Sequence, residues 1–407
     1  MADPPHSAAA EEASRWPIVW LACGAGIGKL PPALPEIRVA LDAGLVMGGW
    51  IASLISLTGF ALGLIAGSVA DRFGQRRVLL FGLGALTAGS LIGAVAPTGE
   101  VMLAARLVES IGFTAVTITG GAIVVRVTAR RDRRMALGIW SSYIPVGFAG
   151  MLIAGAAIHD AIGWRALWIV CAALTLIWAA VFARATAGWQ RRQAGEIVPE
   201  ALLRNIRRTV GSRGAVLVAG CFALYAAQHI SLMNWLPTYM REVHGSGALA
   251  AASLPALVLL FNAGGNYLAA WGMGRGVPAW VLLAAGAAGM AATEIGIFSG
   301  ALPESLRLLS AVLFGVAGGL VPAAALGSVA TYTPSPAQIG TMNGLMVMGT
   351  NAGQLFGPPA LAAAREAAGS WEGALWLVLA LALAGVLTAL AARRFERRAA
   401  APANTLD

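Results

Sequence analysis

The stretch GSVADRFGQRR, residues 67–77, is a short run of charge in a chain that is otherwise strongly apolar. Apolar windows flank it at 46–69 and 78–96, and a helix needs ~20 such residues to cross a bilayer. Its glycines allow close helix approach, and its arginines can hold a turn at a membrane surface. Asp71 can accept a hydrogen bond from a helix N-terminus or from an arginine. The stretch therefore predicts a tight polar turn between two membrane-spanning helices.

The same apolar character recurs along the chain. Of the 407 residues, 58% are hydrophobic and only 12% are charged, which is too little charge for the surface of a soluble protein of this size. We therefore predict an all-α membrane protein with twelve transmembrane helices. The predicted spans are 16–35, 46–69, 78–96, 101–126, 136–157, 164–183, 214–239, 248–272, 279–299, 305–329, 338–364 and 371–392.

One long hydrophilic break, at 183–214, divides these windows into two groups of six and carries seven arginines. It predicts a cytoplasmic linker between two pseudo-symmetric six-helix bundles, with a substrate path between the bundles. The predicted organisation is a cytoplasmic N-terminal tail at 1–15, a bundle at 16–183, the linker at 184–213, a second bundle at 214–392 and a cytoplasmic C-terminal tail at 393–407.

The basic residues predict the orientation. With both termini cytoplasmic, 21 arginines fall in cytoplasmic segments and five in external ones, which is the asymmetry of the positive-inside rule. This asymmetry accounts for the net charge of +9 without nucleic-acid binding. The leader MADPPHSAAAEEAS is acidic, so we expect the first span to be retained rather than cleaved. The expected location is a bacterial inner membrane, with the protein multi-pass and monomeric.

The sequence offers no signature of an enzyme. Gly24, Gly26 and Gly28 are spaced G-x-G-x-G, which differs from the dinucleotide fingerprint. Lys29 is the only lysine of the chain, and the residues around it do not form a P-loop. The three cysteines lie in different apolar windows without metal-ligand spacing, so we interpret them as small buried hydrophobes. We expect no cofactor, no metal and no enzymatic activity.

The charged turn at 67–77 resembles the loop signature of the major facilitator superfamily, G-x-x-x-D-R-x-G-R-R, with Gln75 in one basic position. LPPALPEI after Lys29 is similar to the end of the family's first helix, where prolines stop or kink the span. RLVESIGF at 106–113 resembles its fourth-helix pattern. The corresponding loop of the second half, at 272–278, lacks the aspartate. The resemblance implies a gating loop that latches the two bundles, formed by Gly67, Asp71, Arg72, Gly74, Arg76 and Arg77.

Three shorter segments resemble one branch of that superfamily. WSSYIPVGFAG at 140–150, NWLPTYM at 234–240 and MNGLMVMGTNAGQLFGPP at 342–359 are similar to cyanate- and nitroimidazole-type carriers. Exporters of the superfamily typically carry G-P-x-x-G-G in the fifth span, and SYIPVGFAG departs from that pattern. This branch resemblance implies transport of a small polar solute.

A few ionisable side chains lie inside the predicted spans, where each costs ~2.5–3.5 kcal/mol at the centre. The resemblance places Lys29, Arg106 and His229 on helices that line the path. Lys29 and Arg106 could form a positive site for an anion, or Lys29 could snorkel to the interface. Arg106 and Glu109 share a helical face, so they could form an internal ion pair, or Glu109 could titrate. Glu294 and His229 are further candidates for proton coupling.

Neutral polar residues could supply further substrate contacts from both bundles, although hydrogen bonding between helices is the alternative interpretation. The substrate-binding candidates are Lys29, Arg106, Tyr143, His229, Asn234, Asn262 and Asn351.

From these observations we expect a secondary active transporter that moves a small anionic or polar organic solute by alternating access, coupled to protons. The alternative is proton-driven export of a drug or of a secreted metabolite such as a siderophore. A third possibility, a membrane sensor that has kept the fold and lost transport, is disfavoured by the charged turn and by the charges within the spans. The expected partners are the substrate, protons and the lipid bilayer.

Overall fold

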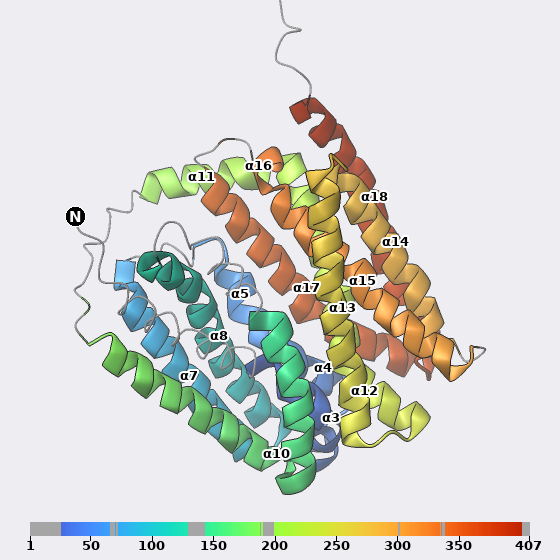
Figure 1. Ribbon diagram of the computed structural model, residues 1–407. Helices are drawn as coiled ribbons and strands as arrows, with labels where there is room; N and C mark the ends of the chain where they lie inside the picture. Colours follow the sequence, from blue (N-terminus) through green and yellow to red (C-terminus); the bar gives the residue numbers. More distant parts are fainter. Residues whose placement is uncertain are drawn as a thin grey trace, which may run out of the picture.

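The computed structural model describes residues 26–65, 70, 72–128, 143–187, 189, 199–299, 302–333, 335 and 338–400. Within these ranges the chain forms helices and turns, and no strand (Figure 1). The helices of the first half are α3 Leu30–Ala40, α4 Leu45–Ser53, η1 Leu54–Ser56, α5 Leu57–Leu62, α7 Gln75–Ala94, α8 Gly99–Val127 and α10 Tyr143–Ala185. Those that follow are α11 Pro199–Gly211, α12 Arg213–His244, α13 Ala248–Gly274, α14 Ala279–Phe298, α15 Glu304–Gly327, α16 Val329–Tyr332, α17 Ile339–Ala368, η3 Glu372–Ala374 and α18 Leu375–Ala400.

Nine helical segments of the described chain are long and apolar enough to cross a membrane. One of them, within α10, joins two predicted spans across Gly163, where φ is +82° and the helical path turns. Such a positive φ is readily adopted by glycine, which has no Cβ to clash. The prediction of an all-α membrane fold is therefore confirmed. Helix α17 is long enough but less apolar, because asparagine, glutamine, threonine and glycine interrupt it.

The helices pack into two groups that meet at one end of the molecule (Figure 1). In the first group α7 packs between α8 and α10, and in the second α15 packs on α13 and α14, while α12 packs on α17 and α18. The groups touch where α3 meets α12, α4 meets α17 and α10 meets α13. We call this the paired end, comprising residues 34–45 of the first group and residues 235–252 and 358–374 of the second.

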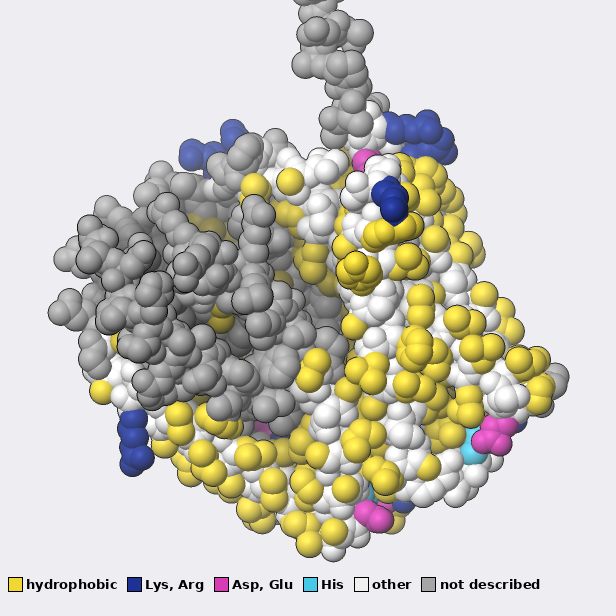
Figure 2. All heavy atoms as spheres, viewed as in Figure 1, with side chains coloured by type: hydrophobic (Ala, Val, Ile, Leu, Met, Phe, Trp, Pro, Cys, Tyr) yellow, Lys and Arg dark blue, Asp and Glu magenta, His cyan; other side chains and the backbone are white. Residues whose placement is uncertain are grey.

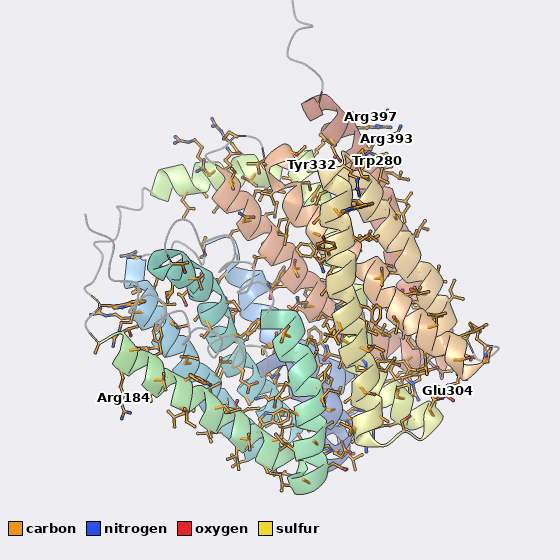
Figure 3. All side chains as sticks on the ribbon, in the orientation of Figure 1. Arg184, Trp280, Glu304, Tyr332, Arg393 and Arg397 are labelled. Carbon is orange, nitrogen blue, oxygen red and sulfur yellow. The ribbon has the colours of Figure 1, made fainter. Side chains whose placement is uncertain are left out.

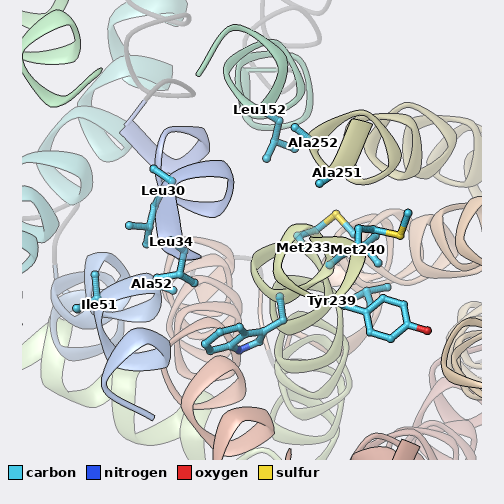
Figure 4. Close-up of a cluster of buried hydrophobic side chains, with 14 of the residues drawn as sticks. Leu30, Leu34, Ile51, Ala52, Leu152, Met233, Tyr239, Met240, Ala251 and Ala252 are labelled. Atoms are coloured by element: carbon cyan, nitrogen blue, oxygen red, sulfur yellow. The ribbon is translucent and has the colours of Figure 1, made fainter. Parts of the chain in front are cut away.

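An apolar cluster fills the junction between the two groups (Figure 4). Leu30, Leu34 and Leu152 come from the first group, and Met233 and Ala252 face them from the second. All five are buried. Within a membrane such burial gains little from the hydrophobic effect, because lipid tails are as apolar as these side chains, so the stabilisation comes from dense van der Waals packing. The two groups are therefore held together at the paired end largely by side-chain packing.

Glycines let α4 and α5 lie directly against α17 across the same junction. A Cβ added at Gly49 would lie 2.6 Å from the Cα of Pro359, which is closer than Cβ contacts in proteins come. A Cβ added at Gly63 would lie 3.2 Å or less from the backbone of Gly344 and Met348. Small residues at such crossings are typical of helix packing in membranes. The absence of a side chain at these positions thus sets how closely the two groups approach.

At the other end of the molecule, α18 caps the start of α14. Glu396 accepts hydrogen bonds from the backbone N–H groups of Ala279 at 2.8 Å and Trp280 at 3.0 Å. The hydroxyl of Tyr332 donates to the same carboxylate at 2.9 Å. A carboxylate at a helix N-terminus satisfies free donors and complements the helix dipole. Helix α18 continues past the predicted boundary at 392, and this extension carries the cap (Figure 3).

The surface is consistent with a protein surrounded by lipid. Hydrophobic side chains cover the flanks of the second group, whereas basic and acidic side chains gather at the two ends (Figure 2). Exposed apolar residues such as Leu383, Leu387 and Leu260 are 57–60% accessible. Apolar patches of this extent rarely face water in soluble proteins.

Candidate functional site

Helix α3 begins at Leu30, and Lys29, which separates it from the helical residues 26–28, keeps helical backbone angles (φ −67°, ψ −28°), so only the hydrogen-bond pattern is interrupted there. Pro31 and Pro32 have no N–H, so they cannot donate to the carbonyls of Ile27 and Gly28. The helix restarts at Leu30 with Pro31 in its first turn, where a missing donor costs nothing. The sequence predicts that these prolines stop or kink the span, but the structure shows only a local loss of helical hydrogen bonds before them, with helical backbone angles at Lys29. The prolines do not end the helix, which continues to Ala40 with Pro35 inside it.

The Lys29 ammonium lies in a buried ion cluster with Ser90, Arg106 and Glu109. The Lys29 Nζ donates to Glu109 Oε1 at 2.5 Å and to Ser90 Oγ at 2.8 Å. Ser90 in turn donates to Glu109 Oε1 at 2.7 Å. Arg106 donates to the second carboxylate oxygen of Glu109, and its Nε donates to the carbonyl of Ile51 at 3.0 Å. One carboxylate therefore links α3, α7 and α8.

Two glycines and a tryptophan around this cluster provide the space and the contacts that it needs. A Cβ at Gly89 would lie 2.5 Å from Cγ of Glu109, so glycine leaves the room that the glutamate occupies. The indole of Trp168 lies 4.7 Å from the Lys29 ammonium and supplies a cation–π contact from α10. Gly93 leaves room for that indole in the same way. Two glycines of α7 thus create the space for the charged pair and its aromatic wall.

The cluster carries an excess of one positive charge, because two cations share one carboxylate. Lys29 is 0% exposed, and Arg106 and Glu109 are 1% exposed, so none of the three charges reaches a membrane surface. The ion pair predicted between Arg106 and Glu109 is confirmed. The alternative in which Lys29 snorkels to the interface does not describe this structure. Removing one partner from a buried ion pair typically costs about 3–5 kcal/mol, so this cluster is strongly coupled.

A second polar group lies in the other half of the molecule, around His229 on α12. Its ring stacks between Tyr225 at 5.2 Å and Phe314 at 5.9 Å. Asn262 donates to the Tyr225 hydroxyl at 3.2 Å, and Asn266 donates to the Asn262 side chain at 3.0 Å. The His229 Nδ1 has no hydrogen-bond partner among the described residues. His229 and Asn262, two of the predicted candidates, are therefore brought together.

Other predicted residues lie apart from both groups. Asn234 and Asn351 each donate to a carbonyl one turn earlier in their own helix, at 2.9 and 2.8 Å. Glu294 is buried on α14, and its Oε2 has no partner within the described chain. Tyr143 begins α10, but its side chain lies outside the described residues. Among the described side chains, Asn234, Asn351 and Glu294 share no hydrogen bond or ion pair with Glu109 in this conformation.

The predicted gating loop is described only in part, since Gly67 and Asp71 lie outside the described residues. Gly74 has φ +90° and opens α7, and Arg72 and Arg77 are exposed. Arg76 donates to the Thr186 hydroxyl at 2.8 Å and to the carbonyl of Ala183 at 3.1 Å. This arginine therefore ties α7 to the end of α10 in the same half. Its described contacts do not join the two halves.

Sequence reasoning missed a network of ion pairs that crosses the paired end. Arg241 of α12 lies 2.5 Å from Glu36 of α3, and His159 of α10 lies 3.1 Å from the other oxygen of Glu36. Glu242 lies 3.7 Å from Arg38 and 3.6 Å from Arg365, which belong to α3 and α17. The opposite charges at 36 and 38 and at 241 and 242 were the available signal. Only the fold shows that these four positions meet.

Glu36, which lies just beyond the predicted first span, makes the paired end sensitive to acid. Burial alone would raise the pKa of its carboxyl, but the hydrogen bonds and charges of His159 and Arg241 outweigh burial and hold it below the ordinary 4.5. Because the pKa of Glu36 is lowered in the folded state, its ion pairs stabilise the paired end above pH 4.5. This contribution is lost as the pH falls through the lowered pKa.

We therefore expect the apparent melting temperature of the purified wild type to fall as the pH drops from 7 toward 3. Glu36→Gln should melt lower than wild type at pH 7 and lose less on acidification, because its side chain cannot titrate. Glu372→Gln, at an exposed position of the same end, is the matched control and should follow the wild type. Identical melting curves for wild type and Glu36→Gln at both pH values would contradict the expectation.

Comparisons with known proteins agree with this architecture. The sequence profile of the Major Facilitator Superfamily matches residues 18–309. The structure is similar to a bacterial homologue of the human lysosomal transporter Spinster, with a TM-score of 0.76, 16% identity and coverage of 97% of this chain and 98% of that one. It is equally similar to a mutant of the nucleoside transporter NupG, with a TM-score of 0.76, 15% identity and coverage of 94% and 99%.

Curated relatives include exporters and resistance proteins. The cephamycin export protein CmcT of Amycolatopsis lactamdurans is 26% identical over 351 residues, which cover 80% of this chain and 72% of that protein. The methylenomycin A resistance protein of Streptomyces coelicolor is 30% identical over 168 residues, 41% of this chain and 35% of that protein. The match to the latter thus spans about a third of its length. Family profile, fold and relatives are those of membrane transporters, and the chain belongs to the major facilitator superfamily.

Proposed function

We propose that this chain is a proton-coupled exporter of small organic molecules that works by alternating access, with Glu109 as its proton site. The observation that carries the proposal is the buried cluster in which one carboxylate is shared by two cations from different helices. One curated relative that matches 80% of this chain is named for cephamycin export, which favours export over the import of a small anion.

The cluster can couple proton binding to movement through simple electrostatics. When Glu109 is ionised, it binds both Lys29, which directly precedes α3, and Arg106 of α8. A proton on Glu109 removes the shared counter-charge and leaves two cations close together at low dielectric, so the cluster must open. Because Lys29 directly precedes α3, the released ammonium can move together with that helix. The ionised and the protonated form of Glu109 would thus favour two different arrangements of the cluster.

We place the paired end on the outside of the membrane, which follows the predicted orientation. This assignment is supported by the arginine count, because the opposite orientation would put 21 arginines outside and only five in the cytoplasm, against the positive-inside rule. In this orientation the structure is closed to the outside. Substrate would then enter from the cytoplasm, as an exporter requires.

The test is transport by purified protein reconstituted in liposomes that contain a pH-sensitive dye. A cephamycin, a simple aromatic carboxylate and a lipophilic cation would each be supplied, with and without an imposed proton gradient. We expect at least one compound to be moved against its gradient and to dissipate the proton gradient at the same time. Transport that ignores the proton gradient would refute coupling, and accumulation only in the direction of proton flow would indicate import.

The second candidate, a proton-linked carrier of a small anion, is favoured by one specific observation. The ion cluster has an excess positive charge, and an anion that displaced Glu109 could pair with Lys29 and Arg106. Expression in a host that lacks its own efflux pumps separates the two. An exporter should raise tolerance to its substrate, whereas an importer of a toxic analogue should lower it.

A further inference from the structure

We infer that α11 is an interfacial helix that binds the anionic phospholipid headgroups of the membrane. The helix lies between the two halves in the sequence and contacts α12 and α17 of the second half, and it runs across the direction of α13 and α17, which extend along the molecule (Figure 1). A helix in this position runs along the membrane surface.

One side of α11 packs on the protein. Thr209 is buried, Leu202 and Ile206 are half-buried, and the helix contacts α12 and α17. With 3.6 residues per turn, these three side chains fall on one face. Helix α11 is thus held in place by α12 and α17 on this face, and its opposite face does not pack on them.

The outward side combines apolar and basic side chains in the arrangement that a lipid interface favours. Leu203 is 52% exposed and Val210 is 44% exposed. Arg204, Arg207 and Arg208 are exposed beside them, and basic side chains are visible along the outer edge of α11 (Figure 2). Apolar side chains of an interfacial helix enter the boundary of the acyl chains, while arginines bind phosphate oxygens. Nucleic acid would use the arginines and leave the two apolar side chains exposed to water.

Tryptophans mark the level of the membrane interface at the same end of the molecule. Trp280 lies 4.9 Å below the Arg393 guanidinium, and both are at the end where α11 lies (Figures 1 and 3). Trp271 is 52% exposed, and its ring lies 3.7 Å from Arg275. Tryptophan and arginine are enriched together where acyl chains meet headgroups. The arginines of α11 therefore lie at headgroup level. There each arginine raises the affinity of the helix for an anionic leaflet by a factor of about five.

Helix α11 connects the two halves in the sequence, and these halves move in alternating access. Binding of α11 to the bilayer therefore restrains the linker while the two halves change their relative orientation. The test uses the full-length protein in nanodiscs of neutral phosphatidylcholine, or of the same lipid with a third of phosphatidylglycerol. Hydrogen–deuterium exchange is followed for residues 199–211. We expect exchange about tenfold slower, or more, in the anionic bilayer.

Arg204→Gln, Arg207→Gln and Arg208→Gln combined should abolish this lipid dependence. The matched control combines Arg184→Gln, Arg394→Gln and Arg397→Gln, which removes the same charge from exposed positions outside α11 and should keep the dependence. Equal exchange of α11 in the two bilayers would overturn the inference, because packing on α12 and α17 alone would then account for its order. Loss of the dependence in both variants would also overturn it, since net charge rather than α11 would then be responsible.

Discussion

Replacing Glu109 by glutamine is expected to abolish proton-driven transport. Glutamine keeps the size of the side chain and can accept hydrogen bonds from Lys29 and Ser90, but it cannot bind and release a proton at working pH. It also leaves two buried cations without their counter-charge, so we expect stability to fall by about 3 kcal/mol or more. Proton uptake by proteoliposomes during substrate movement, and the apparent melting temperature, measure the two effects separately.

The design separates lost coupling from lost stability. Lys29→Met combined with Glu109→Gln restores the net charge of the wild-type cluster and leaves Arg106 bonded to the carbonyl of Ile51. This double variant should regain part of the melting temperature and still fail to couple transport to protons. Glu294→Gln alters a buried carboxylate without an ionic partner in the described chain and should transport like the wild type. Proton-driven transport by Glu109→Gln would exclude Glu109 as the proton site.

Replacing Gly49 by valine is expected to prevent closure of the paired end and to reduce transport at least about tenfold. The added Cβ would lie 2.6 Å from Cα and 2.8 Å from N of Pro359. Both atoms belong to the backbone of α17, so no side-chain rotation can relieve the clash. The two halves must then separate at this crossing, and alternating access loses one of its two end states.

Closure can be measured by labelling a cysteine introduced at Leu34 with a membrane-impermeant reagent, in a background that lacks the native cysteines. Leu34 is 0% exposed in the junction, so labelling should be slow in the parent and faster in the Gly49→Val variant. Gly84→Val is the matched control, because Gly84 also lies within a helix and has open space around its Cβ position. If both valine variants transported and labelled alike, the contact with Pro359 would not control closure.

Much of the fold followed from the sequence because hydropathy is a property of consecutive residues. The apolar windows, the break at 183–214 and the charged turn at 67–77 could each be read locally. The pair Arg106 and Glu109 was predictable for the same reason, since residues three apart share a helical face. The continuation of α3 to Ala40 was not predictable in this way, because prolines signal a disturbance of the helix but do not show whether it ends there.

The partners of Lys29 could not be predicted in this way. Ser90 and Glu109 are 61 and 80 positions away on α7 and α8, and only the tertiary fold brings them to the ammonium of Lys29. Ser90 looks unremarkable in its apolar window, as does Gly89, which makes room for Glu109. The pairs at Glu36 and Glu242 require the two halves to meet, which is a property of one conformation. Local patterns therefore predict the elements, and tertiary contacts complete the site.

The carboxylate of Glu396 has a practical consequence for handling the protein. Hydropathy suggests that the chain can be shortened to residue 392, at the end of the last apolar window, yet Glu396 lies beyond that point. Its two oxygens hold the first backbone donors of α14 and the hydroxyl of Tyr332. Purification tags and cleavage sites belong after Ala400, so that trimming the tail does not uncap a helix in the middle of the second half.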